Sequence, residues 1–421
     1  MTRMQGELSR TNGLLRERFG ALGRLQDGAP VVFCDAPGGT QVPDRVIAAM
    51  ADYLGRSNAN SHGAFATSVE TDAVIDAARA ASADLLNASI EEIVFGPNMT
   101  TLAFALSRSL ARSLRAGDEV VVTRLDHDAN IAPWREAAAD AGARVLFADF
   151  DPRDGTLDEA SLLDRLGART RVVALTLASN ALGTITPAAR LIATIKQETG
   201  ALVIADGVHL AQHRYIDVAE LGADVVFVSP YKVFGPHLGL MWARRELLER
   251  LHAYKVRPAP DAVPDRFETG TKAHEALAGW AAAVDHLAEL GALAGGTGDR
   301  RALLRAAYGA IEAYETELSV LFLQGAAAIP SLRLYGPADP VRAGARTPTF
   351  AVRLADQHPR ATAKALAARG IFVWDGNYYA VEVMERLGLE ASGGAVRVGF
   401  CHYNTHAEVR RVLEALAFLS G

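Results

Sequence analysis

The strongest constraint on the fold is an alternation of apolar and amphipathic segments between about residues 90 and 245. Short runs rich in β-branched residues occur at 91–96, 118–125, 143–150, 171–178, 201–207 and 223–230. Several are almost continuously apolar, which is typical of strands covered by helices on both faces. Helical segments such as 129–142 and 187–200 separate most of them. Repeated strand–helix–strand units predict an α/β fold with a mostly parallel sheet, and such sheets bind ligands beyond the C-terminal ends of their strands.

The pattern changes after residue 295, which predicts a second and smaller domain. A long helical segment at 299–324 leads into separated strand candidates and further helical segments, at 331–336, 349–354, 360–370, 371–376 and 405–419. These elements predict an α+β arrangement. We therefore expect a large domain over residues 31–295, and a small domain formed by residues 1–30 together with residues 296–421.

The composition excludes several classes of protein. The 43 basic and 49 acidic side chains leave a net charge of -6, which argues against nucleic acid or an anionic membrane as the main partner. No apolar run is long enough for a spanning helix, and the first twenty residues lack the apolar centre of a signal peptide. The two cysteines, Cys34 and Cys401, predict neither a disulfide scaffold nor a metal site. The simplest expectation is a soluble cytoplasmic protein.

An amine and a carboxylate follow two consecutive strand candidates. Lys232 comes directly after the run VVFVSPY, and Asp206 ends the preceding run ALVIAD. A short crossover would place both groups at neighbouring strand ends. This pair suits pyridoxal phosphate, because a lysine can form the Schiff base and an acid can keep the pyridine nitrogen protonated. A salt bridge at a loop is the alternative.

Other residues predicted at the same edge fit this cofactor. Met99, Thr100 and Thr101 open a helix after a Gly-Pro turn, where backbone N–H groups can bind a phosphate; an ordinary helix cap is the alternative. His127 follows strand 118–125 and could cover a planar ring, although it could equally be a surface or core histidine. Arg397 could clamp a substrate carboxylate, with a solvated arginine as the alternative.

Several segments together resemble a known family. They are LASNALGTITP (177–187), ADGVHLAQHRYIDV (205–218), GADVVFVSPYKVFGPHLG (222–239), NANSHG (58–63), DHDANIAPW (126–134), RFETGT (266–271) and RVGFCHYNT (397–405). They resemble the class V aminotransferase family of fold-type I pyridoxal-phosphate enzymes, in the branch of cysteine desulfurases and selenocysteine lyases. The resemblance runs from about residue 31 to the C-terminus. It implies a large domain with a seven-stranded sheet and a smaller C-terminal domain.

The resemblance also implies roles for individual residues. Lys232 would be the Schiff-base lysine and proton shuttle, Asp206 the partner of the pyridine nitrogen, and His127 the stacking ring. His209 would lie near the phenolic oxygen. Met99, Thr100, Ser229 and Tyr231 would bind the phosphate, together with Thr271 from the partner subunit of a homodimer with shared active sites. Tyr231 stands where a histidine is common. Asn180 would approach either the phenolic oxygen of the cofactor or the substrate carboxylate. The substrate would also contact Arg397, His62 and Tyr379.

One loop departs from this family pattern. In WDGNYYAVEVMERLG (374–388), Tyr379 stands where desulfurases carry their nucleophilic cysteine. Tyrosine cannot replace a thiolate in persulfide formation. Cys401 would share a strand face with Arg397 and Gly399 by alternation, so it could lie near the site, or it could be a small buried hydrophobe. Tyr378 and Tyr379 could protonate a leaving group, or could pack over the mouth of the site.

The expected function is that of a pyridoxal-phosphate lyase or transferase acting on a small amino acid through an external aldimine. The pocket motifs favour β-elimination or C–S bond cleavage. Aminotransferase and epimerase activities are alternatives, because all three reactions use the same core residues. A protein that binds the cofactor without turnover is the alternative from another class.

Overall fold

A seven-stranded sheet lies at the centre of the molecule, and its strand order is β4-β10-β9-β8-β7-β5-β6. The computed structural model describes residues 15–355 and 357–421. The strands are β4 (Ile93–Gly96), β5 (Glu119–Thr123), β6 (Arg144–Ala148), β7 (Thr170–Thr176), β8 (Leu202–Asp206), β9 (Val225–Val228) and β10 (Gly239–Ala243). Strands β9, β8, β7, β5 and β6 pair in parallel, whereas β10 is antiparallel to both of its neighbours. The predicted mostly parallel sheet is therefore confirmed, with β10 as a strand that the sequence did not reveal.

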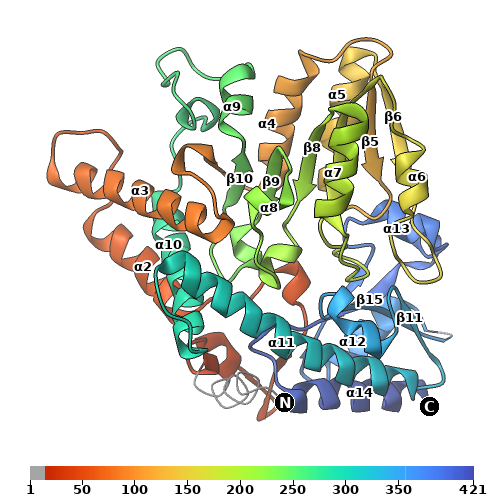
Figure 1. Ribbon diagram of the computed structural model, residues 1–421. Coiled ribbons are helices and arrows are strands. Elements are labelled where there is room, and N and C mark those ends of the chain that lie inside the picture. The colour runs from red at the N-terminus through yellow and green to blue at the C-terminus, as the bar shows by residue number, and fades with distance from the viewer. Residues whose placement is uncertain (1–14, 356) are drawn as a thin grey trace.

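Both faces of this sheet are covered, which explains the apolar runs. Val121 packs into one core cluster, while its neighbours Val120 and Val122 pack into another. Helices α4 (Met99–Ala111) and α5 (Ala132–Ala141) contribute to the second cluster, and α7 (Ala188–Thr199) to the first. The short helices α6 (Glu159–Leu163), α8 (Val218–Leu221) and α9 (Arg245–Arg250) complete this part of the chain (Figure 1). Alternate residues of each strand thus face different helical layers.

A group of long helices lies beside the sheet. Helix α10 (His274–Leu293) packs against α2 (Asp44–Arg56), α3 (Ala66–Leu86) and α11 (Arg300–Ala327). The fully buried Trp280 of α10 donates a hydrogen bond to Ser82 Oγ of α3 at 2.8 Å. Figure 1 shows α2 and α3 extending to one side of the molecule. Their position matters below, because the loop between them carries one of the predicted site residues.

The C-terminal part forms a second sheet with the order β11-β12-β15-β14. Its elements are β11 (Leu332–Tyr335), β12 (Thr349–Leu354), β14 (Trp374–Gly376) and β15 (Ala395–Gly399), with helices α12 (Pro359–Ala367), α13 (Val381–Arg386) and α14 (His406–Ser420). The predicted strand 371–376 was wrong as one element: it is interrupted after β13 (Ile371–Phe372), which leaves the sheet to pair with β3 (Val32–Phe33). Strand β15 ends at Gly399, so Cys401 does not belong to it.

The described N-terminal segment contacts the C-terminal part. Arg16 forms an ion pair with Glu408 of α14 at 2.8 Å, and the ring of Phe19 packs against Tyr403. A small hairpin, β1 (Leu25–Gln26) and β2 (Ala29–Pro30), leads from there to β3. The domain boundaries at residues 30 and 295 stay a prediction, and residues 1–14 of the expected small domain lie outside the described residues. Within the described ranges, none of the helices has the length and apolar character needed to cross a membrane.

Candidate active site

Lys232 and Asp206 lie at the ends of adjacent strands, as the sequence predicted. Strands β8 and β9 pair in parallel, with Asp206 opposite Phe227. Beyond β9 the chain forms a short 3-10 helix, η6 (Pro230–Lys232), in which the Lys232 N–H donates to the Ser229 carbonyl at 2.9 Å. Both side chains are almost fully buried. The sheet therefore presents an amine and a carboxylate together at its C-terminal edge.

Burial and charge move the pKa values of these two groups toward each other. Burial lowers the pKa of Lys232 to about 8, Arg397 lowers it further, and Asp206 opposes both effects. Burial raises the pKa of Asp206 to about 6. Two smaller effects lower this pKa: the hydrogen bond that the Val208 N–H donates to Asp206 Oδ1 at 2.9 Å, and the charge of Lys232. An amine with a pKa near 8 has a substantial neutral, nucleophilic fraction at physiological pH.

An inner pocket of about 80 Å³ surrounds this pair. Every residue that the sequence assigned to cofactor binding, except Thr271, lines it: Met99, Thr100, His127, Asn180, Asp206, His209, Ser229, Tyr231 and Lys232. These residues come from the loops that follow β4, β5, β7, β8 and β9. The parallel sheet brings together side chains that are up to about 130 residues apart in the chain, as expected at such an edge.

The start of α4 forms one wall of the pocket. Asn98 caps this helix, and its Oδ1 accepts a hydrogen bond from the Thr101 N–H at 2.8 Å. Met99 and Thr100 occupy the first turn, where backbone N–H groups have no acceptor within the helix. Gly239 of β10 lies against this turn, since a Cβ there would meet the Asn98 carbonyl carbon at 2.4 Å. The arrangement presents N–H groups and a hydroxyl to an anion.

His127 presents a flat, uncharged ring to the pocket. Its Nδ1 accepts the Ala129 N–H at 3.0 Å, at the start of η4 (Asp128–Asn130). Burial lowers its pKa to about 3, with smaller contributions from Lys232 and Arg397, so the ring is neutral. The ring of Tyr379 stacks on it with centroids 5.5 Å apart and an interplanar angle of 20°. A neutral imidazole suits stacking on a second planar ring.

His209 forms hydrogen bonds with two residues that the sequence did not indicate. Its Nε2 lies 3.1 Å from the hydroxyl oxygens of both Thr347 and Thr349. Burial lowers its pKa well below the usual range, so this ring is also neutral. Its buried Nδ1 has no hydrogen-bond partner in the described part of the chain. Thr347 and Thr349 are about 140 residues away in the sequence, and no local pattern marks them.

A larger cavity of about 1090 Å³ opens above the inner pocket, and Arg397 lies in its wall. Arg397 Nη1 donates to the Asn180 carbonyl at 3.0 Å, and the guanidinium lies 4.5 Å from the ring centre of Tyr378. Burial lowers the pKa of Arg397 to about 10, which leaves it charged at neutral pH. It is therefore positioned to bind an anionic group close to Lys232.

The loop with Tyr378 and Tyr379 closes one side of this cavity. The Asn180 side chain donates to the Tyr378 carbonyl at 2.9 Å, and the Asp128 N–H donates to the Tyr379 carbonyl at 2.7 Å. Asn377 Oδ1 accepts the Tyr379 N–H at 3.0 Å. The side chain of Tyr379 is 71% exposed. The loop is thus attached to the two neighbouring segments that also carry Asn180 and His127.

Neither cysteine belongs to the site. Cys34 and Cys401 are free, fully buried and absent from the lining of both cavities. Burial raises the pKa of both thiols well above the usual range. Of the two roles that the sequence left open for Cys401, the structure supports the small buried hydrophobe.

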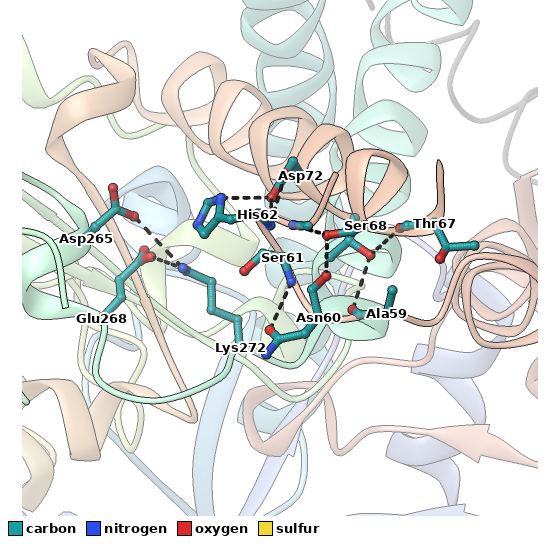
Figure 2. Close-up of polar contacts among 12 residues, drawn as sticks. Ala59, Asn60, Ser61, His62, Thr67, Ser68, Asp72, Asp265, Glu268 and Lys272 are labelled. Carbon is teal, nitrogen blue, oxygen red and sulfur yellow. Dashed lines mark hydrogen bonds and ion pairs between the residues drawn. The ribbon is translucent and has the colours of Figure 1, made fainter. Parts of the chain in front are cut away.

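His62 and Thr271 also lie away from the cavity. The side chain of His62 is 78% exposed and pairs with Asp72 at 3.2 Å. Thr271 is exposed beside Lys272, which pairs with Glu268 at 2.8 Å. Figure 2 shows loop 59–62 held against α3, with Lys272 and its carboxylates nearby. Two residues assigned to the site therefore share a different surface of the same chain.

The inner pocket has the groups that pyridoxal phosphate requires. Lys232 and Asp206 match the aldehyde and the pyridine nitrogen, and the α4 turn matches a phosphate. Two buried atoms in this pocket, Asn180 Oδ1 and His209 Nδ1, have no partner among the described residues and would gain one from such a group. The fit is good. Over the described ranges, no group of three or more His, Cys, Asp or Glu side chains is arranged to hold a metal ion.

Comparison with known proteins gives consistent results. Residues 32–412 match the family model for class-V aminotransferases. A cysteine desulfurase of Klebsiella pneumoniae is 32% identical over 418 residues, covering 96% of each chain. An uncharacterised protein of Mycobacterium tuberculosis is 33% identical over 389 residues, covering 92% of this chain and 95% of its own. The apo structure of a cysteine desulfurase from Thermococcus onnurineus superimposes with a TM-score of 0.83 at 26% identity, covering 93% and 94% of the two chains.

Proposed function

The chain belongs to the class-V aminotransferase family, and from this premise we propose that it is a pyridoxal-phosphate enzyme that cleaves the C–S bond of a small amino acid. The observation that carries the proposal is the inner pocket. It places Lys232, Asp206 and His127 around one small space beside the anion-binding turn of α4. Cysteine desulfurases among the relatives and structural neighbours support C–S cleavage as the reaction.

Different residues of the inner pocket would bind different parts of the cofactor. Asp206 would keep the pyridine nitrogen protonated, and His127 would cover one ring face. Thr100, Ser229 and the first N–H groups of α4 would hold the phosphate. Tyr231, whose pKa is raised by burial and which therefore keeps its proton, would donate one further hydrogen bond. When bound, the cofactor supplies an electron sink for negative charge at the substrate Cα.

The remaining groups act on the substrate. Arg397 would hold the carboxylate, aided by Asn180, whose carbonyl fixes the guanidinium. Lys232 Nζ would take the Cα proton, and the sulfur would leave Cβ with the bonding electrons. Because the only two cysteines are buried outside the cavity, no thiolate is placed to accept the sulfur. We therefore favour β-elimination, in which cysteine and water yield pyruvate, ammonium and sulfide.

His62 and Thr271 fit this function as contributions from a second copy of the chain. Both are exposed and absent from the lining of their own chain's cavity, and His274, three residues after Thr271, forms a hydrogen bond with the Ala59 backbone in the loop of His62. Helices α2 and α3, together with the residue that precedes α3, expose large apolar side chains, namely Ile47, Leu54, Phe65 and Val69. Several large apolar side chains exposed on neighbouring helices are suited to an interface. We propose a cytoplasmic homodimer in which each chain completes the site of the other.

The first test is the absorption spectrum after addition of pyridoxal phosphate. The wild-type protein should gain a visible band, and Lys232→Ala should lack it. Lys364→Ala, at an exposed position on α12, is the matched control and should keep the band. A wild-type protein that stays colourless with excess cofactor would contradict the proposal.

The second test identifies the products formed from L-cysteine by the loaded protein. Pyruvate with sulfide is the expected result, and it disappears in Lys232→Ala. Alanine with sulfide would mean that desulfuration proceeds without a loop cysteine. If neither keto acid nor alanine forms from cysteine, transamination and epimerisation of other amino acids become the activities to examine.

A further inference from the structure

We propose that the substrate is an L-amino acid whose β-sulfur carries an aromatic group, and that Tyr379 recognises this group. The inference rests on the proposed C–S cleavage and adds the class of substrate. It is carried by the aromatic wall of the outer cavity, by the rigid hold on the loop of Tyr379, and by the lack of a thiol in the cavity.

The outer cavity shares Thr100, His127 and Lys232 with the inner pocket, so the cofactor would take part of it, but the space that is left exceeds what a cysteine side chain requires. Its volume is about 1090 Å³, against about 80 Å³ for the inner pocket that surrounds Lys232. The wall contains Phe104, Trp374, Tyr378 and Tyr379. Tyr379 is 71% exposed and Trp374 51% exposed, although both are large and apolar. One face of Tyr379 stacks on His127, and the exposed aromatic surface that remains beside the polar reaction centre is suited to binding a second aromatic ring.

The backbone at Tyr379 is held in one conformation by its surroundings. Both Tyr378 and Tyr379 adopt left-handed backbone conformations, with φ of 55° and 59°. Bulky residues pay a penalty in this region, so the surrounding contacts must enforce it. Asn377 does so by accepting the Tyr379 N–H, while its Nδ2 donates to Glu390 Oε1 at 2.9 Å. With its backbone fixed and its ring stacked on His127, Tyr379 loses less conformational freedom when it binds a ligand ring.

The charges in the cavity favour a neutral substituent. Its lining includes three carboxylates, those of Asp128, Asp375 and Glu390. Asp375 pairs with Arg360 at 2.9 Å, and Glu390 accepts from Asn377. The two cations of the lining, Lys232 and Arg397, lie at the inner end, close enough for Arg397 to lower the pKa of Lys232. An anionic substituent would therefore be repelled by these carboxylates, whereas an uncharged ring would not be repelled.

The missing thiol fits an S-substituted substrate. Lys232 Nζ takes the Cα proton, the Cβ–S bond breaks, and the sulfur leaves with the electron pair as a thiolate. One proton converts this thiolate to the free thiol, and addition of water to the remaining fragment gives pyruvate and ammonium. The atoms balance with water as the single co-reactant, and no protein thiol is needed to carry the sulfur away.

The test compares two substrates that differ in the ring. S-benzyl-L-cysteine and S-methyl-L-cysteine both release an alkyl thiol, which is measured with a thiol reagent alongside pyruvate. The wild-type enzyme should prefer the benzyl substrate by roughly 10-fold or more in kcat/KM, the scale on which a hydrophobic pocket discriminates. Tyr379→Ala should lose most of this preference, mainly through the benzyl substrate. Tyr379→Phe should keep it, because recognition uses the ring face.

Two further variants serve as a control outside the cavities and as a second test of the aromatic wall. Tyr254→Ala removes a tyrosine that is 49% exposed and lies outside both cavities, so the preference should be unchanged. Trp374→Ala should also reduce the preference, and it tests the aromatic wall if Tyr379→Ala fails to fold. The visible band of the bound cofactor must be the same in each variant, since Tyr379 stacks on His127.

The outcomes separate this inference from the proposed function. Equal kcat/KM values for both substrates, or a preference that survives both Tyr379→Ala and Trp374→Ala, would overturn the aromatic substrate while C–S cleavage stands. Absence of thiol and pyruvate from both substrates and from cysteine, with the visible band present, would overturn the proposed function itself.

Discussion

At the scale of single residues, three charged groups set the protonation of the site. Lys232 is pushed toward its neutral form by burial and by Arg397, and held toward its charged form by Asp206. The pKa of Asp206 rises to about 6 because burial disfavours its charged form more strongly than Lys232 favours it. The balance predicts opposite effects for removing the two neighbours of the lysine.

In the cofactor-free protein, Asp206→Asn should lower the pKa of Lys232 below about 8, because the carboxylate that stabilises its charge is lost. Arg397→Gln should raise the pKa, because a nearby cation is removed. The measurement is the rate at which an amine reagent labels Lys232 as a function of pH, followed by mass spectrometry. At pH 7, a fall of about one unit would raise the neutral fraction of Lys232, and with it the labelling rate, roughly fivefold.

Lys196 provides an internal control in the same samples. It pairs with Asp224, which lies before the start of β9, at the other end of that strand from Lys232. Its labelling should not change in either variant. If both substitutions move the pKa of Lys232 in the same direction, the balance described here is wrong and altered burial is responsible.

At the scale of elements, the first turn of α4 is positioned by the antiparallel strand β10. Gly239 faces Gly96 across β10 and β4, and it allows the backbone at Asn98 to approach closely. A Cβ at this position would lie 2.4 Å from the Asn98 carbonyl carbon, and the obstacle is backbone that cannot rotate away. The strand that the sequence did not reveal therefore sets the place of the anion-binding turn.

Gly239→Ala should displace this turn and weaken binding of pyridoxal phosphate several-fold. It should also lower the free energy of unfolding by about 1–3 kcal/mol, as overpacking in a close-packed interior does. Titration of the visible band and thermal unfolding measure the two effects. Gly55→Ala is the control, because this α2 glycine has no atom within 4 Å of an added Cβ. Alanine there should be neutral or stabilising by about 0.5–1 kcal/mol. Unchanged cofactor affinity in Gly239→Ala would contradict the assigned role.

At the scale of the whole molecule, the predicted site residues fall on two separate surfaces. One set lines the pocket at the edge of the seven-stranded sheet, while His62 and Thr271 are exposed beside α2 and α3. Two copies that bury the apolar faces of these helices would bring the second set to the partner's pocket. This arrangement can be tested by mixing variants.

Lys232→Ala should be inactive, and a chain with both His62→Ala and Thr271→Ala should have low activity. After the two are mixed and their subunits exchanged, activity should return to roughly a quarter of the wild-type value, because half of the dimers are hybrids with one intact site. The expected result also includes a dimeric mass by light scattering. Mixing Lys232→Ala with Asp206→Ala is the control, and it should stay inactive. No recovery from a confirmed mixture of dimers would exclude sites shared in this way.

The sequence by itself determined the parallel sheet and the residues at its edge. Apolar runs of strand length and a lysine or aspartate directly after them are local patterns, and a parallel sheet places all such strand ends together. The confirmed pairing of β8 with β9 and the common pocket of Lys232, Asp206 and His127 follow from this rule. Lys232, Asp206 and His127 could therefore be predicted from local patterns, whereas Asn180, His209, Ser229 and Tyr231 were implied by the family resemblance.

Only the tertiary structure showed which residues from distant parts of the chain contact the pocket, and which predicted residues lie elsewhere. The hydroxyls of Thr347 and Thr349 reach His209 across about 140 residues, β10 returns antiparallel to hold Asn98, and Cys401 lies in the core because β15 ends at Gly399. The family resemblance assigned Thr271 to the partner's site, but nothing in the sequence showed that His62 also lies outside its own chain's cavity. Such contacts depend on how the domains pack, and packing brings together segments for which no local sequence pattern indicates the contact.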